Sequence, residues 1–130
     1  MSTAGDGARP VVMVVDDDDV LRSYLQELLE GEGYTTIVAS NGREALKRMS
    51  DGVPDIVLTD LVMPECEGVE LMQSVRREIG PVPVIAMSGG RRMSSTYLEV
   101  ADRLGADATL AKPFKARELL DTIERILADA

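Results

Sequence analysis

The chain has 130 residues, of which 45% are hydrophobic and 28% charged, and its formal net charge is -9. This length suits one domain with a single core, and the negative charge excludes nucleic acid as the main partner, because polyanion binding relies on Lys and Arg. There is no histidine and only one cysteine, Cys66, which excludes the commonest zinc ligand and an internal disulfide. No apolar run is long enough for a membrane span and residues 1–9 lack the apolar core of a signal peptide, so we expect a cytoplasmic protein with no membrane partner.

The first part of the chain predicts a strand followed by a helix. Residues 1–9 are small and polar, which predicts a disordered leader before a domain at residues 10–130. Val11–Val15 is a continuous β-branched and apolar run, typical of a strand buried on both faces, and four aspartates follow it. An amphipathic helix comes next, and Gly31 and Gly33 end it. The predicted apolar stripe of this helix comprises Leu21, Tyr24, Leu25, Leu28 and Leu29.

The middle of the chain repeats this alternation. Thr35–Ala39 is a predicted strand, and Asn41 is the expected N-cap of the next helix. A third apolar run ends abruptly at the carboxylate of Asp60. A proline and a glycine soon after Asp60 prevent this strand from continuing, and a helix is predicted over residues 68–78.

The last part predicts two more strand and helix pairs. The strand at residues 83–87 closes on Ser88, and the helix after it ends at Gly105. Ala108–Ala111 is the last strand, and Lys112 follows it. The apolar stripe of the final helix comprises Leu119, Leu120, Ile123, Ile126 and Leu127. Five strands alternating with five helices through short loops predict an α/β fold with a doubly wound parallel sheet, covered by helices on both faces.

The reactive candidates all lie directly after predicted strands. Asp16 and Asp17 follow the first strand, Asp60 ends the third, Ser88 follows the fourth and Lys112 follows the fifth. Because the carboxyl ends of parallel strands meet at one edge of the sheet, where ligands bind in such folds, we expect these side chains to form one site.

The charges of this site predict a bound cation. Two carboxylates about 4 Å apart repel each other by roughly 4 kcal/mol at an effective dielectric constant near 20, and one lysine cannot offset three negative charges. A site made of oxygen ligands suits Mg²⁺. With the cation bound, a carboxylate oxygen can attack phosphorus and form an acyl phosphate. Lys112 would then neutralise the phosphoryl oxygens, and the Ser88 hydroxyl would donate a hydrogen bond to one of them.

At these residues the sequence closely resembles the receiver domain of two-component response regulators, from Val11 to about Leu127. The matching motifs are Val14-Val15-Asp16-Asp17 before a helix, Asp60-Leu61-Val62-Met63-Pro64 with Gly68 after it, the hydroxyl residue Ser88, and Lys112-Pro113-Phe114. Each motif alone is weak, but their order, each after its own strand, makes the resemblance specific. The family pattern also places an arginine six residues after the first acid of the pair, and Arg22 therefore identifies that pair as Asp16 and Asp17.

The resemblance implies a flavodoxin-like (βα)5 fold with strand order 2-1-3-4-5, and a role for each site residue. Asp60 would be both the phosphoacceptor and a metal ligand, with Lys112 and Ser88 as its catalytic neighbours. The implied Mg²⁺ ligands are Asp17, Asp60 and the backbone carbonyl of Val62, with Asp16 acting through water. The family also has a cis peptide bond at the position of Lys112–Pro113.

The function implied by the resemblance is that of a stand-alone, phosphorylation-controlled signalling switch. A histidine kinase or phosphotransfer protein would transfer a phosphoryl group to Asp60, and a downstream protein partner would read the result on the face made by the fourth helix, fifth strand and fifth helix. The chain would not be an enzyme beyond its own phosphorylation and dephosphorylation. Thr109 stands where receivers commonly have an aromatic residue, so the signal would have to travel by loop and helix rearrangement.

Several alternatives remain open at the level of sequence. One is a small Mg²⁺-dependent phosphatase of the haloacid dehalogenase type, although that class needs a second acid where this chain has Val62. Others are a flavodoxin-like cofactor module, or a pseudo-receiver that is never phosphorylated. The aspartate run also caps a helix, a role expected of Asp18 or Asp19, and Ser88 also suits a turn. Cys66 is expected to be incidental.

Overall fold

The computed structural model describes residues 9–60, 67–88 and 105–129. The strands are β1 (Val11–Val15), β2 (Thr35–Ala39), β3 (Ile56–Asp60), β4 (Val84–Ser88) and β5 (Ala108–Ala111). The helices are α1 (Asp19–Gly31), α2 (Gly42–Met49), α3 (Glu67–Ser74), which continues as a π-helical turn (Val75–Ile79), and α5 (Ala116–Asp129). All strand pairs are parallel and the order is β2-β1-β3-β4-β5, as predicted.

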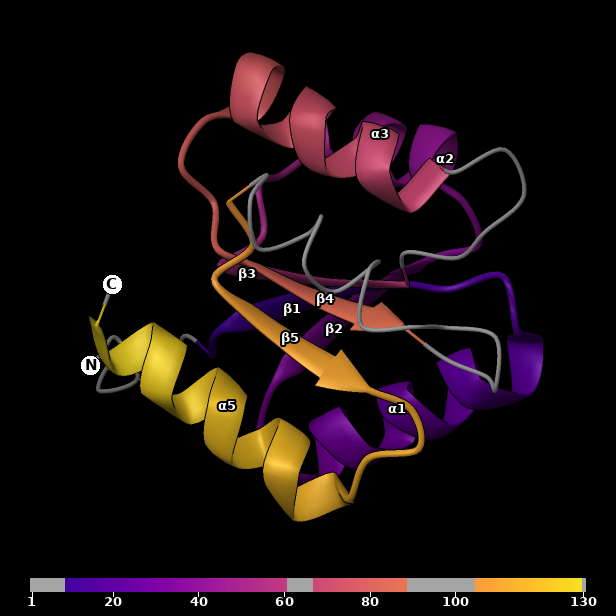
Figure 1. Cartoon of the computed structure of the whole chain (residues 1–130), viewed down its shortest axis with the longest axis vertical. Coiled ribbons are helices and arrows are strands. Elements are labelled where there is room, and N and C mark those ends of the chain that lie inside the picture. Colours follow the sequence, from indigo (N-terminus) through magenta and orange to yellow (C-terminus); the bar gives the residue numbers. More distant parts are fainter. Residues whose placement is uncertain (1–8, 61–66, 89–104, 130) are drawn as a thin grey trace.

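The helices lie on both faces of the sheet. Figure 1 shows α1 and α5 together on one face, and α2 and α3 on the other. Alternate strand residues supply the two cores, because successive side chains of a strand point to opposite faces. Val12 and Val14 pack with α1 and α5, whereas Met13 and Val15 pack with α2 and α3. The continuous apolar sequence of β1 is therefore explained by burial on both faces.

The predicted stripe of α1 is correct except at Tyr24. Leu25 and Leu29 are fully buried against the sheet, whereas Tyr24 is 51% exposed. At 3.6 residues per turn, Tyr24 lies roughly 120° around the helix from the middle of the Leu25 and Leu29 face. The spacing of Tyr24 fits the predicted apolar stripe, but the sheet covers the side of the stripe that carries Leu25 and Leu29 and leaves Tyr24 exposed.

The other bounds differ little from the predictions. β4 begins at Val84 rather than at residue 83, because Pro83 has no N–H to add to the ladder. The helix predicted over residues 68–78 ends in a π-helical turn, which closes where Gly80 N–H donates to Val75 O at 2.8 Å. Gly80 has a φ of 116°, which favours glycine. The predicted leader lies almost wholly outside the described residues, and so does the helix predicted before Gly105.

The start of α2 confirms Asn41 as an N-cap and adds a second contact that the sequence did not predict. The Asn41 side chain accepts from Glu44 N–H at 2.8 Å, and the Glu44 carboxylate accepts from Ser40 N–H at 2.6 Å. The bond to Asn41 satisfies a backbone donor that the first helical turn leaves unpaired, and the bond from Ser40 ties the residue before the cap to the same turn. The Ser40 N–H is the main reason that the pKa of Glu44 lies below its usual value, outweighing an opposing effect of burial.

We expect Glu44→Gln to lower stability at neutral pH and not in acid. A carboxyl group whose folded pKa is depressed contributes stability above its unfolded pKa, and this contribution is lost as pH falls through the folded pKa. Urea denaturation of the wild type and of Glu44→Gln, at neutral pH and at about pH 3, measures the difference. Glu78→Gln on the surface is the control. A difference in the free energy of unfolding between the wild type and Glu44→Gln that is the same at both pH values would contradict this account.

Candidate functional site

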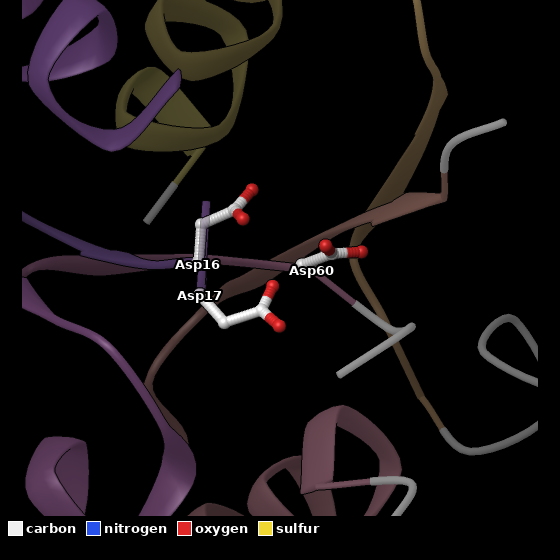
Figure 2. A group of neighbouring side chains, drawn as sticks. All are labelled: Asp16, Asp17 and Asp60. Atoms are coloured by element: carbon white, nitrogen blue, oxygen red, sulfur yellow. The ribbon is translucent and has the colours of Figure 1, made fainter. Parts of the chain in front are cut away.

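Three carboxylates meet at the carboxyl edge of the sheet. Asp16 and Asp17 follow β1, and Asp60 is the last residue of the neighbouring strand β3. One oxygen from each carboxylate lies within 4.8 Å of the others. Figure 2 shows that the side chains of Asp16 and Asp17 leave the backbone in different directions, with Asp60 beside them. The predicted meeting of these three residues is therefore confirmed.

Two of these carboxylates are removed from water. Asp16 is 0% exposed and Asp60 is 5% exposed, whereas Asp17 is exposed. Burying a carboxylate is expensive unless it is paired and hydrogen-bonded. The site therefore needs positive charge close to Asp16 and Asp60.

Lys112 supplies that charge from the end of β5. Its Nζ donates to Asp16 Oδ2 at 2.9 Å and to Asp60 Oδ2 at 3.2 Å. Burial alone would lower the pKa of Lys112, but the hydrogen bond to Asp16 and the charges of Asp60 and Asp16 together raise it above its usual value. Lys112 is thus held as an ammonium ion between the two buried carboxylates, and the peptide bond to Pro113 is cis as the resemblance implied.

The sheet register places Ser88 at the same edge. Asp60 pairs with Met87, so Ser88 lies one position beyond it on β4, and Ser88 pairs with Ala111, the residue before Lys112. Asp60 and Ser88 therefore end neighbouring strands, and Lys112 directly follows the next strand, β5. Val62 lies outside the described residues.

The turn between β1 and α1 is fixed by its own side chains. Asp18 is the N-cap of α1 and accepts from Val20 N–H and Leu21 N–H, at 3.0 and 3.1 Å. Asp16 Oδ1 accepts from Asp18 N–H at 2.9 Å. The expected capping by Asp18 is confirmed, so the four aspartates divide into one cap and a pair that reaches the site.

Arg22 is a residue of this site that the sequence did not assign. Its Nη1 donates to the backbone carbonyl of Asp16 at 2.8 Å, and its Nη2 pairs with Asp19 at 2.5 Å. The only signal in the sequence was its spacing from Asp16, which marked the register of the acidic pair and said nothing of a contact.

The donor set fits a hard divalent cation. All three groups are carboxylates, the ligands that Mg²⁺ prefers, and one ammonium ion leaves them with an excess of negative charge. Both oxygens of Asp16 already accept hydrogen bonds, from Asp18 N–H and from Lys112. Among the described residues, no hydrogen bond or ion pair engages the exposed Asp17 carboxylate.

A hollow of about 780 Å³ opens next to Lys112. Lys112, Pro113 and Phe114 form one side, and Val20, Leu21 and Tyr24 of α1 form the other. Val20 and Tyr24 are strongly exposed for apolar and aromatic side chains. Among the described residues, the side of the site next to Lys112 is therefore bordered by exposed apolar surface.

Comparison with known proteins decides the family. The family model described as "Response regulator receiver domain" matches residues 12–124, most of the chain. The chain belongs to the response regulator receiver domain family. This confirms the resemblance of the motifs and identifies a receiver domain of two-component signalling systems, a family of signalling domains rather than of classical enzymes. The phosphatase, cofactor-module and pseudo-receiver alternatives receive no support.

Individual relatives agree with the family. The receiver domain is 40% identical over 116 residues to the transcriptional regulatory protein CpxR of Escherichia coli, covering 89% of this chain and 48% of that protein. It is 33% identical over 116 residues to the regulatory protein PhoP of Bacillus subtilis, with the same coverage of both chains. The chain thus spans about half the length of these curated relatives.

Solved structures agree with the fold. The CheY-like receiver domain protein of Methanospirillum hungatei has a TM-score of 0.86 at 27% identity, over 94% of this chain and 96% of that chain. The chemotaxis response regulator CheY4 of Vibrio cholerae has a TM-score of 0.81 at 28% identity, over 92% and 99%. Within the described part of the receiver domain, no helix combines the length and apolar character that crossing a membrane requires.

Proposed function

We propose that this receiver domain accepts a phosphoryl group on the Asp60 carboxylate, from a histidine kinase or a phosphotransfer protein. The observation that carries the proposal is the position of Asp60, which ends β3 at the carboxyl edge of the sheet, hydrogen-bonded to Lys112 and beside two further carboxylates. A carboxylate oxygen held next to an ammonium ion at the end of a strand is suited to attack on phosphorus.

In the proposed transfer, a carboxylate oxygen of Asp60 forms a bond to phosphorus. The bond between phosphorus and the donor's imidazole nitrogen breaks, and its electron pair stays on that nitrogen. The Lys112 ammonium, now 3.2 Å from Asp60 Oδ2, neutralises a phosphoryl oxygen as charge develops there. The Ser88 hydroxyl donates to another phosphoryl oxygen. Water later attacks the phosphorus, the bond between phosphorus and the Asp60 oxygen breaks, and inorganic phosphate leaves, which restores the Asp60 carboxylate.

The proposed cofactor is Mg²⁺, which when bound neutralises the phosphoryl oxygens. Asp17, Asp60 and the backbone carbonyl of Val62 would hold the ion directly, and Asp16 would act through water. The hydrogen bonds to Asp16 support this division, because Asp18 N–H and Lys112 already use both of its oxygens. The exposed Asp17 carboxylate is the one directed to solvent, from which the ion arrives.

The proposed partners follow from the same edge. A protein donor has to bring its phosphorylated side chain to Asp60, and the hollow beside Lys112, with Val20 and Tyr24 exposed, offers apolar surface for it. Output is by binding to a downstream protein in the cytoplasm. Thr109, on β5 opposite Ala86, stands where an aromatic switch would be, so the phosphorylated state is read through movements of loops and helices.

Phosphorylation by a small acyl phosphate tests the proposal without an identified kinase. We expect wild-type protein with Mg²⁺ to gain the mass of one phosphoryl group, in an adduct that is stable in acid and labile in base. We expect EDTA to suppress the adduct by about 100-fold, because the phosphoryl charge then lacks its cation. Intact-protein mass spectrometry measures both results. The absence of an adduct with this donor and with a cognate kinase would refute the proposal.

A further inference from the structure

We propose that Arg22 is a positioning residue for the acidic pair, which it aims by holding the peptide unit between Asp16 and Asp17. This inference rests on the metal site of the proposed function. Arg22 Nη1 donates to the Asp16 carbonyl oxygen at 2.8 Å, and this oxygen belongs to the peptide plane that joins the two aspartates. Because that plane is rigid, fixing its carbonyl fixes the rotation on both sides of it.

The neighbouring peptide units are also anchored. Asp16 N–H donates to Ala39 O of β2 at 3.1 Å, and Asp18 N–H donates to Asp16 Oδ1 at 2.9 Å. The Arg22 bond supplies the anchor between these two. Three consecutive peptide planes are then held by three different groups, so the backbone that carries the exposed Asp17 side chain is fixed, even though no contact of the described residues holds its carboxylate.

Arg22 is itself well placed to hold this carbonyl. Its backbone N–H donates to Asp18 O at 2.9 Å within α1, and its side chain is only 19% exposed. The planar guanidinium donates to Asp16 O and to the Asp19 carboxylate at the same time, from two different nitrogens. A lysine has one ammonium and lacks this fork, so it cannot reproduce both bonds in one geometry.

Charge and positioning predict opposite effects when Arg22 is removed. A cation bonded to the backbone of Asp16 repels a metal ion held by the acidic pair, so the loss of its charge alone would tighten metal binding. Loss of the bond to Asp16 O would release the peptide unit and weaken metal binding, because residues that orient metal ligands typically account for 10- to 100-fold in affinity. The sign of the change therefore separates the two roles.

The test is Mn²⁺ binding followed by electron paramagnetic resonance, with Mg²⁺ affinity obtained by competition. We expect Arg22→Met, which keeps most of the aliphatic stem, to raise the dissociation constant for both ions about tenfold. Arg22→Lys is expected to weaken binding as well, although it keeps the charge. Unchanged or tighter binding in these variants, with a wild type that binds normally, would overturn the inference.

Two controls separate this role from general stability. Asp19→Asn removes the charge of the ion pair but keeps an amide oxygen that can accept from Arg22 Nη2, and it leaves the bond to Asp16 O. Both bonds of the guanidinium are then retained, so we expect less than about a twofold change in metal affinity. Arg48→Met removes an arginine of α2 whose ion pair is with Glu44, far along the chain from the site, and is expected to leave affinity unchanged. If Arg22→Met does not fold, as shown by urea denaturation in EDTA, Arg22→Lys decides the question.

Failure of this inference is distinguishable from failure of the proposed function. If the wild type binds neither Mn²⁺ nor Mg²⁺, the proposed metal site is wrong and Arg22 has nothing to position. If the wild type binds both ions and the Arg22 variants bind them equally well, the metal site stands and only the role of Arg22 is wrong.

Discussion

Replacing Asp60 with asparagine is expected to abolish phosphorylation by the small acyl phosphate, a loss of at least about 1,000-fold in the rate of adduct formation. The amide has no carboxylate oxygen to attack phosphorus. Asp16 does not replace it, because Asp18 N–H and Lys112 already use both of its oxygens. Asp17 does not replace it either, because the proposed function assigns its exposed carboxylate to the cation. Intact-protein mass spectrometry against the wild type measures the loss.

The matched control is Asp51→Asn. Asp51 follows α2 and precedes β3, which places it at the opposite edge of the sheet from Asp60. Asp51→Asn removes the same charge as Asp60→Asn but far from the site, so we expect this variant to be phosphorylated at the wild-type rate. An adduct that forms on Asp60→Asn at the wild-type rate would show that a different residue is the acceptor.

Replacing Lys112 with methionine is expected to impair both stability and phosphorylation. Asp16 and Asp60 are buried and share this ammonium ion, so its removal leaves two neighbouring carboxylates without the cation that pairs with both. Breaking a buried pair by removing one partner costs roughly 3–5 kcal/mol in free energy of unfolding. Losing a charge that stabilises the developing phosphoryl oxygens slows transfer by about 100- to 1,000-fold.

Urea denaturation and the initial rate of adduct formation measure these two effects. Lys115→Met is the control, because it is the same substitution at an exposed lysine just before α5. We expect added Mg²⁺ to recover part of the lost stability of Lys112→Met, since a cation that binds only the folded state stabilises it. If Lys112→Met and Lys115→Met behave alike in both measurements, the central role of Lys112 is wrong.

The fold and the meeting of the site residues could be predicted because both depend on order along the chain. β1 and β3 are continuous apolar runs that end on aspartates, and parallel strands bring their carboxyl ends to one edge. The pairing of Lys112 with carboxylates from β1 and β3 follows from the same rule. Neither step requires the direction of a side chain.

The features that could not be predicted do depend on side-chain direction. One such feature is which member of the acidic pair contacts Lys112: Asp16 does, and the exposed Asp17 does not. Consecutive residues at a strand end point to different sides, and the sequence alone does not tell which side faces Lys112. The contact from Arg22 to the Asp16 carbonyl spans six residues, a separation that no regular helical spacing explains. It depends on the turn at residues 16–18, which the side-chain hydrogen bonds of Asp16 and Asp18 fix.

Reductive mapping of the phosphorylated residue tests the central claim most directly. Borohydride reduces an aspartyl phosphate to homoserine, which marks the acceptor permanently, and tandem mass spectrometry then locates it in the chain. We predict homoserine at position 60, only in samples given both the acyl phosphate and Mg²⁺. Homoserine at position 16 or 17, or an adduct that leaves residue 60 as unmodified aspartate, would contradict the account.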